Sequence, residues 1–124
     1  MQPFKVALCQ VQAFGVEEAE TNLDNILRAL DEAGAAGAQL VALPECAYPA
    51  YYLGGDDVYT RPGVRSFDEV AALFGEKARR YGYWLAAGMA MPRPGGGANQ
   101  QWRRVRPGWH DAGPLRQAIP LAFR

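Results

Sequence analysis

The sequence predicts an α/β fold built on a mainly parallel sheet. Three short, largely apolar segments have the character of buried strands, at residues 4–11, 39–43 and 83–91. Two segments with the helical spacing of apolar residues separate them. The resulting order of strand, helix, strand, helix and strand is typical of parallel sheets joined by right-handed crossovers.

The first strand, FKVALCQV, contains neither glycine nor proline. Thr21 and Asp24 after it resemble a helix capping box, whereas Glu17 and Glu18 favour a helix start one turn earlier. The segment GAAG at residues 34–37 ends this first helix. The helix itself is predicted from apolar residues at i, i+3, i+4 and i+7, which share one face: Leu23, Ile26, Leu27 and Leu30.

The second helix has clearer boundaries. Ser66 followed by Glu69 has the pattern of a serine-capped N-terminus, and Gly82 stands where glycine commonly ends a helix. Apolar residues keep the helical spacing between these two ends: Phe67, Val70, Ala71, Phe74 and Ala78. The strand at residues 83–91 follows directly.

Length and composition limit the class of protein. With 124 residues, of which 49% are apolar and 21% charged, the chain is at most one globular domain. Its formal net charge of zero gives no general reason to expect a nucleic-acid or membrane partner. No apolar run approaches the ~20 residues of a membrane helix, and the N-terminus does not resemble a signal peptide. Two cysteines, Cys9 and Cys46, are too few for a disulfide framework, so we expect a cytoplasmic location.

Glu45 is the first candidate functional residue. It follows the second strand directly after Pro44, which ends the strand ladder because it has no N–H to donate. Ligand sites in open α/β sheets lie outside the carboxyl ends of the strands, where this carboxylate falls. A glutamate at the end of a strand is more often an ordinary surface residue. Here three nearby tyrosines would shield it from water, which makes a carboxylate a better general base: Tyr48, Tyr51 and Tyr52.

The segments KVALCQVQA, ETNLDNILRALDEAGAAGAQLVALPE and PECAYPAYY resemble the N-terminal part of the nitrilase superfamily, the carbon–nitrogen hydrolases. The resemblance covers residues 4–91. It implies the first part of an α-β-β-α sandwich in a family that tends to form homo-oligomers. It also implies hydrolysis of the non-peptide C–N bonds of small amides or nitriles, without a cofactor or metal, by a Glu, a Lys and a Cys.

The resemblance assigns the family's general base to Glu45 and a substrate-binding aromatic residue to Tyr51. Ala50 departs from the family pattern, which more often has a glycine there. The other two catalytic residues have no match. Lys5 falls in the first strand and Lys77 in the second helix, whereas the family lysine follows the third strand and a hairpin.

The two cysteines do not match the family nucleophile either. Cys46 is adjacent to Glu45, so its side chain should point away from that carboxylate, and Cys9 has the character of a small core residue. We therefore expect residues 1–98 to be a partial carbon–nitrogen hydrolase domain that is inactive by itself. The alternative is a binding module of the same fold that has lost the chemistry.

Residues 99–124 differ in character from the rest of the chain. They hold five arginines and one acidic residue, against eight basic and twelve acidic residues in 1–98, and they lack any period of 2 or 3.6. One interpretation is an arginine-rich arm for nucleic acid, with Trp102 and Trp109 among the cations. Our preferred interpretation is translation in the wrong frame. A codon choice that spells the tail, read one base later, gives a strand, a Pro-Asp-Gly turn, a second strand and the residues RYAK. That peptide resembles the hairpin and lysine segment expected here in the family.

Overall fold

The computed structural model describes residues 3–55, 57–93, 98–106 and 110–115. One sheet contains five strands in the order of the chain: β1 (Val6–Leu8), β2 (Leu40–Ala42), β3 (Trp84–Pro92), β4 (Ala98–Arg106) and β5 (His110–Leu115). The first three strands are parallel, and β4 and β5 continue the sheet as antiparallel neighbours. The α/β class and the parallel order of the first three strands are therefore confirmed.

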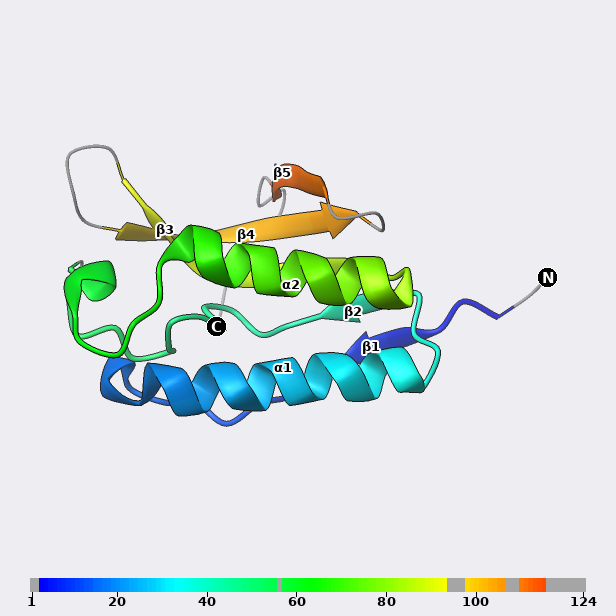
Figure 1. Cartoon of the computed structure of the whole chain (residues 1–124), viewed down its shortest axis with the longest axis horizontal. Coiled ribbons are helices and arrows are strands. Elements are labelled where there is room, and N and C mark those ends of the chain that lie inside the picture. The colour runs from blue at the N-terminus through cyan, green and yellow to red at the C-terminus, as the bar shows by residue number, and fades with distance from the viewer. Residues whose placement is uncertain (1–2, 56, 94–97, 107–109, 116–124) are drawn as a thin grey trace, which may run out of the picture.

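Two helices connect the parallel strands, α1 (Ala19–Ala35) and α2 (Phe67–Tyr81). Each crossover moves one strand further in the same direction, so right-handed connections place both helices on the same face of the sheet. Figure 1 shows α1 and α2 side by side, with β4 and β5 beyond α2 on the side away from α1. Short 3-10 turns precede each helix, at Val16–Glu18 and Val58–Thr60. None of the described helices is long and apolar enough to cross a membrane.

The main core lies between the helices and the sheet. The middle row of the parallel strands, Ala7, Val41 and Leu85, packs against the helices. The apolar stripes of α1 and α2 supply the other side of this core, with these fully buried side chains: Leu23, Ile26, Leu30, Val70, Phe74 and Ala78. The periodicity of the sequence thus identified the buried faces of both helices correctly.

The helix boundaries agree with the sequence prediction except at the start of α1. The Ser66 hydroxyl accepts a hydrogen bond from the Glu69 amide at 3.2 Å, and Gly82 ends α2 in the left-handed conformation with a φ of 70°. The Thr21 cap is wrong, because the N-cap of α1 is Glu18, which makes no side-chain cap bond. A 3-10 turn at Val16–Glu18 leads directly into α1. The helix therefore begins at the earlier of the two positions that the sequence left open, near Glu17 and Glu18.

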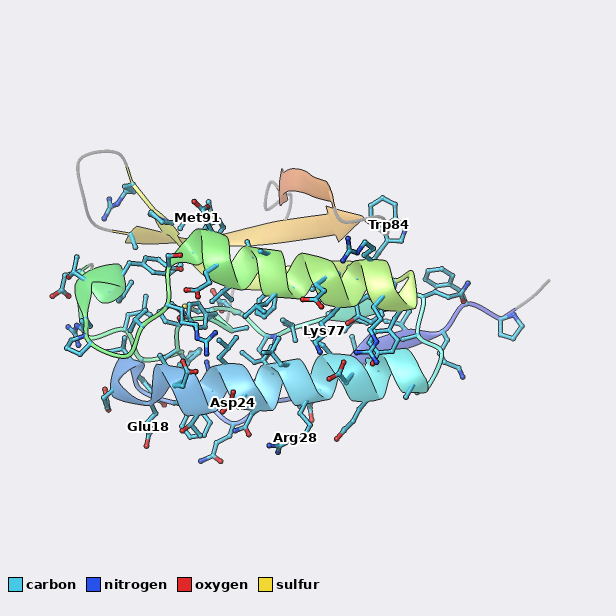
Figure 2. All side chains as sticks on the ribbon, in the orientation of Figure 1. Glu18, Asp24, Arg28, Lys77, Trp84 and Met91 are labelled. Atoms are coloured by element: carbon cyan, nitrogen blue, oxygen red, sulfur yellow. The ribbon has the colours of Figure 1, made fainter. Side chains whose placement is uncertain are left out.

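An ion pair joins the two helices. Lys77 of α2 donates to a carboxylate oxygen of Asp31 on α1 at 3.0 Å, and the Tyr81 hydroxyl donates to the other oxygen at 2.9 Å. Figure 2 shows Lys77 between the helices, whereas Glu18 and Arg28 lie on the side of α1 away from α2. The hydrogen bond from Lys77 is the main reason that the pKa of Asp31 is lowered.

The sequence did not predict β4 and β5. Both fall in the part of the chain that lacks strand periodicity, and β4 pairs with β3 from Leu85↔Val105 to Pro92↔Ala98. Backbone pairing to a long neighbouring strand does not require an alternating pattern of side chains, which is why periodicity alone missed it.

Candidate functional site

Glu45 lies in a turn that interrupts the pairing of the chain with β3. The amide of Leu43 donates to the carbonyl of Ala86 at 2.9 Å. The next bond comes from Ala47, whose amide donates to the carbonyl of Gly88 at 2.7 Å. The two acceptors, Ala86 and Gly88, are two residues apart in β3, whereas the two donors, Leu43 and Ala47, are four residues apart. The segment between the donors therefore holds two residues more than a regular parallel ladder would. Insertions of this kind re-aim side chains next to functional sites.

Gly88 makes room for this turn. A Cβ atom at this residue would lie 2.8 Å from both the Pro44 carbonyl oxygen and the Cys46 nitrogen, and 3.1 Å from the Glu45 Cα. These are backbone atoms, so the turn can cross β3 this closely only because residue 88 has no side chain. Cys46 has a φ of 47°, in the left-handed region that non-glycine residues rarely adopt, so the turn also holds a strained backbone.

Asn22 of α1 holds the segment that follows the turn. Its side-chain amide donates to the carbonyl of Ala47 at 2.6 Å and to that of Pro49 at 2.9 Å. Asn22 is only 2% exposed. Removing its side-chain amide would leave the carbonyls of Ala47 and Pro49 without this buried hydrogen-bond donor, which costs free energy. The helix therefore fixes the path of the chain between Glu45 and Tyr51.

Glu45 and Tyr51 line the same cavity, which has a volume of about 40 Å³. Asn22 and the residues that follow β1 form other parts of its wall. The cavity lies beyond the carboxyl ends of β1 and β2, where the sequence analysis expected a ligand site. The two candidate site residues are thus brought together at one place in the fold.

The other two tyrosines do not line this cavity. Tyr48 is buried, and its hydroxyl both accepts from the Arg65 amide at 2.7 Å and donates to the Arg65 carbonyl at 3.0 Å. Burial raises the pKa of Tyr48 to about 12. Tyr52 is exposed and packs edge-to-face on Tyr51, with ring centroids 5.0 Å apart. Of the three tyrosines expected around the carboxylate, only Tyr51 shares the cavity with Glu45.

Neither cysteine has the character of a nucleophile. Cys46 packs in a small apolar cluster with Val16 and Val58, and burial raises its pKa to about 11. Cys9 packs against the main core, and burial there also raises its pKa. A thiol with a raised pKa stays protonated at neutral pH and reacts poorly.

The lysines lie elsewhere. Lys5 precedes β1, at the opposite end of the parallel strands from Glu45, and its ammonium group donates to the Ala36 carbonyl at 2.8 Å. Lys77 is engaged with Asp31 between the helices. Within the described part of the chain, no three His, Cys, Asp or Glu side chains are grouped so that they could hold a metal ion.

Sequence reasoning missed Asn22 and Gly88. Asn22 carried a usable signal, since it precedes Ile26 by four residues and so places an amide on the apolar stripe of the helix. Gly88 interrupts an apolar strand, which often marks a close approach of another backbone. Neither pattern predicts which segment of the chain Asn22 or Gly88 contacts.

Comparison with known proteins identifies the family. The carbon–nitrogen hydrolase family profile matches residues 5–105. The NitN amidase from Nesterenkonia sp. AN1 is similar in structure, with a TM-score of 0.72 and 21% identity over 94% of this chain and 45% of the amidase. A second structure of that amidase, with acrylamide added to its active-site cysteine, has a TM-score of 0.71 and 20% identity over 95% of this chain and 46% of the amidase.

The C. elegans NitFhit protein has a TM-score of 0.70 and 18% identity, over 89% of this chain and 26% of that protein. No curated protein matches the chain. The chain spans less than half the length of the solved proteins that it resembles. The family profile nevertheless covers most of its residues, and the chain belongs to the carbon–nitrogen hydrolase family.

Proposed function

We propose that this chain carries the general-base part of an amidase or nitrilase site without the rest of the catalytic apparatus. The observation that supports this is the shared cavity of Glu45 and Tyr51 at the carboxyl ends of parallel strands. In this proposal Glu45 and Tyr51 are the residues that would act as general base and contact a small amide or nitrile once the site is complete. The solved relatives include amidases, which agrees with a substrate of that class.

We propose that this chain is inactive by itself. Hydrolysis through an acyl-enzyme needs a nucleophile that attacks the carbonyl or nitrile carbon and a cation that stabilises the charge formed there. Neither cysteine is placed to be that nucleophile, and neither lysine is placed to be that cation. Both cysteines pack against apolar clusters, and both lysines make contacts remote from this turn.

A turnover assay tests this directly. The purified chain is incubated with simple aliphatic amides and nitriles, and ammonia release is measured alongside a Glu45→Gln variant. We expect the two proteins to give the same background rate, because no covalent step can begin. Turnover by the original chain that is lost in the Glu45→Gln variant would overturn the proposal.

A second candidate function is binding without chemistry. It is favoured by the buried Asn22 amide, which keeps the cavity wall in place. A titration with a small amide, followed by NMR at Glu45 and Tyr51, distinguishes the two. Saturable shifts at both residues in the absence of turnover indicate a binding module, whereas no shift at either residue indicates an incomplete site.

We further propose that residues 99–124 are translated out of frame, and that the chain is cytoplasmic. The first proposal rests on the unpatterned, arginine-rich sequence of that segment. The second rests on the two cysteines, both of which are free.

A further inference from the structure

The side-chain amide of Asn22 has a fixed orientation in the wall of the cavity that Glu45 and Tyr51 also line. Its nitrogen, Nδ2, uses both hydrogens, donating to the carbonyl of Ala47 at 2.6 Å and to that of Pro49 at 2.9 Å. Carbonyl oxygens only accept hydrogen bonds, so these two contacts establish which end of the amide is the nitrogen. The amide oxygen, Oδ1, therefore cannot exchange places with Nδ2.

Oδ1 of Asn22 has no hydrogen-bond donor among the residues that the structure describes. The residue is only 2% exposed, and a buried amide oxygen ordinarily accepts at least one hydrogen bond. In the same described ranges, no side-chain oxygen or nitrogen that is sealed from solvent lacks a partner. Oδ1 is therefore not sealed inside the protein. The open space that Asn22 lines is the cavity, so this unpaired acceptor belongs to the cavity wall.

The cavity is small and largely apolar. Its volume is about 40 Å³, and a group of the size of water needs about 10–15 Å³, so only a few heavy atoms fit. This is enough room for the amide end of a small molecule but not for a long chain. Away from bulk water, a hydrogen bond to Oδ1 is stronger than the same bond at the surface. The wall residues with mainly apolar side chains are Val11, Ala13, Pro44, Cys46 and Ala47.

We propose, resting on the function proposed above for Glu45 and Tyr51, that Asn22 is a specificity-determining residue of the same site. Its Oδ1 accepts a hydrogen bond from an N–H group of the bound molecule. A primary amide has two such groups. A nitrile has none, and its nitrogen is itself an acceptor, so no hydrogen would lie between it and Oδ1. Sites that bond an N–H group discriminate against analogues that lack it, because the acceptor is then left unpaired.

An NMR titration of the full chain with three ligands of similar size tests this proposal. Propionamide carries the N–H groups, butan-2-one has a methyl group in place of the NH₂ group, and propionitrile lacks both the carbonyl and the N–H groups. We expect the dissociation constant of propionamide to be at least roughly threefold lower than the other two, the effect of one net hydrogen bond.

The side-chain amide resonances report on the contact itself. The Nδ2 resonance of Asn22 should move when propionamide binds, because a donor at Oδ1 polarises the whole amide group. Asn25 is an internal control in the same spectrum, since it lies on α1 but does not line the cavity. Its side-chain resonance should stay in place.

A pair of variants gives a second measurement. Asn22→Ala removes Oδ1 and should abolish the preference for propionamide over butan-2-one, whereas Asn25→Ala should retain it. Circular dichroism shows whether each variant folds. If Asn22→Ala does not fold, the ligand comparison and the Asn22 resonance of the original chain still test the proposal.

Three results would overturn the role of Asn22. Equal binding of propionamide and butan-2-one would exclude it while leaving a binding site at Glu45 and Tyr51. Binding of none of the ligands would exclude both this role and the binding module. Ammonium chloride that moves the Asn22 resonance as propionamide does would identify a cation site instead. Whether the chain is inactive is measured separately, by ammonia release, so the two proposals can fail independently.

Discussion

Gly88 is the residue on which the position of the Glu45 turn depends most directly. Gly88→Ala would place a methyl group 2.8 Å from two backbone atoms of the turn, and backbone cannot move aside as a flexible side chain can. We expect a loss of roughly 1–3 kcal/mol in the free energy of unfolding, the usual cost of overpacking. Urea unfolding measures this loss, and NMR shows whether the Glu45 amide resonance moves.

Gly63→Ala is the matched control. Gly63 has a φ of 78°, and no atom lies within 4 Å of the position that a methyl group would occupy there, so this change strains the backbone without pressing on the turn. It should lower stability while leaving the Glu45 amide resonance in place. A Gly88→Ala protein with unchanged stability and an unchanged Glu45 resonance would show that the turn is not packed on β3 as described.

The sequence alone predicted some residues of the candidate site and missed others. Glu45 and Tyr51 were predicted because they lie close together in the chain and match a family pattern. The role of Asn22 depends on carbonyls 25 and 27 residues away, and no local pattern records such contacts. Residues that position a site through contacts distant in the sequence are therefore harder to predict than residues, such as Glu45, that directly follow a strand.

Among the elements, the pair of helices gives a prediction about pH. The pKa of Asp31 is lowered, mainly by the hydrogen bond from Lys77, with a smaller contribution from Tyr81. A carboxyl group whose pKa is lower in the folded state stabilises the fold above its unfolded pKa. That stabilisation is lost as the pH falls through the folded pKa. Stability should therefore decrease in acid below the ordinary carboxyl range.

Lys77→Met should reduce this acid dependence. Because the Asp31 side chain is 41% exposed, we expect a loss of at most about 1 kcal/mol at neutral pH and a smaller one in acid. Urea unfolding at several pH values measures the slope, and Arg79→Met removes an exposed cation from the same helix as a control. The pKa of Glu20 is also lowered, by its hydrogen bond with Arg65. Some dependence of stability on pH should therefore remain in the Lys77→Met variant. Equal slopes for the original chain and the Lys77→Met variant would contradict the role of this pair.

The elements that the sequence predicted are those whose packing follows a period. Both helices and the first three strands were found because each buries an apolar face on its neighbours. The first strand is shorter than predicted, Val6–Leu8 rather than residues 4–11, since β1 is an edge strand with one neighbour. The strands β4 and β5 have no such pattern, and only the structure places them.

At the scale of the whole molecule, the unpatterned segment and the antiparallel strands occupy the same residues. The family profile continues to residue 105, beyond the point where the sequence pattern ends. β4 and β5 lie over residues 98–106 and 110–115. The strand pair therefore falls where the peptide read one base later also has two strands. Pro107 and Gly108 of the actual sequence are turn-forming residues as well.

The gene sequence tests the frame hypothesis. Read one base later, a codon choice that spells residues 100–124 gives NSGVVFGPDGTTLGRYAKRFLWHF, in which Pro-Asp-Gly falls at positions 107–109, between β4 and β5. Two of its glycines do not depend on codon choice. Tryptophan has the single codon TGG, so the shifted reading of Trp102 and Trp109 begins with GG and must encode glycine.

We expect the actual codons, shifted by one base, to continue without a stop into a strand, a turn and a lysine. Restoring that frame should then add the cation that Glu45 lacks. If the shifted codons give a stop or an unrelated peptide, the frame hypothesis is wrong, and the arginine-rich arm becomes the better account of this segment.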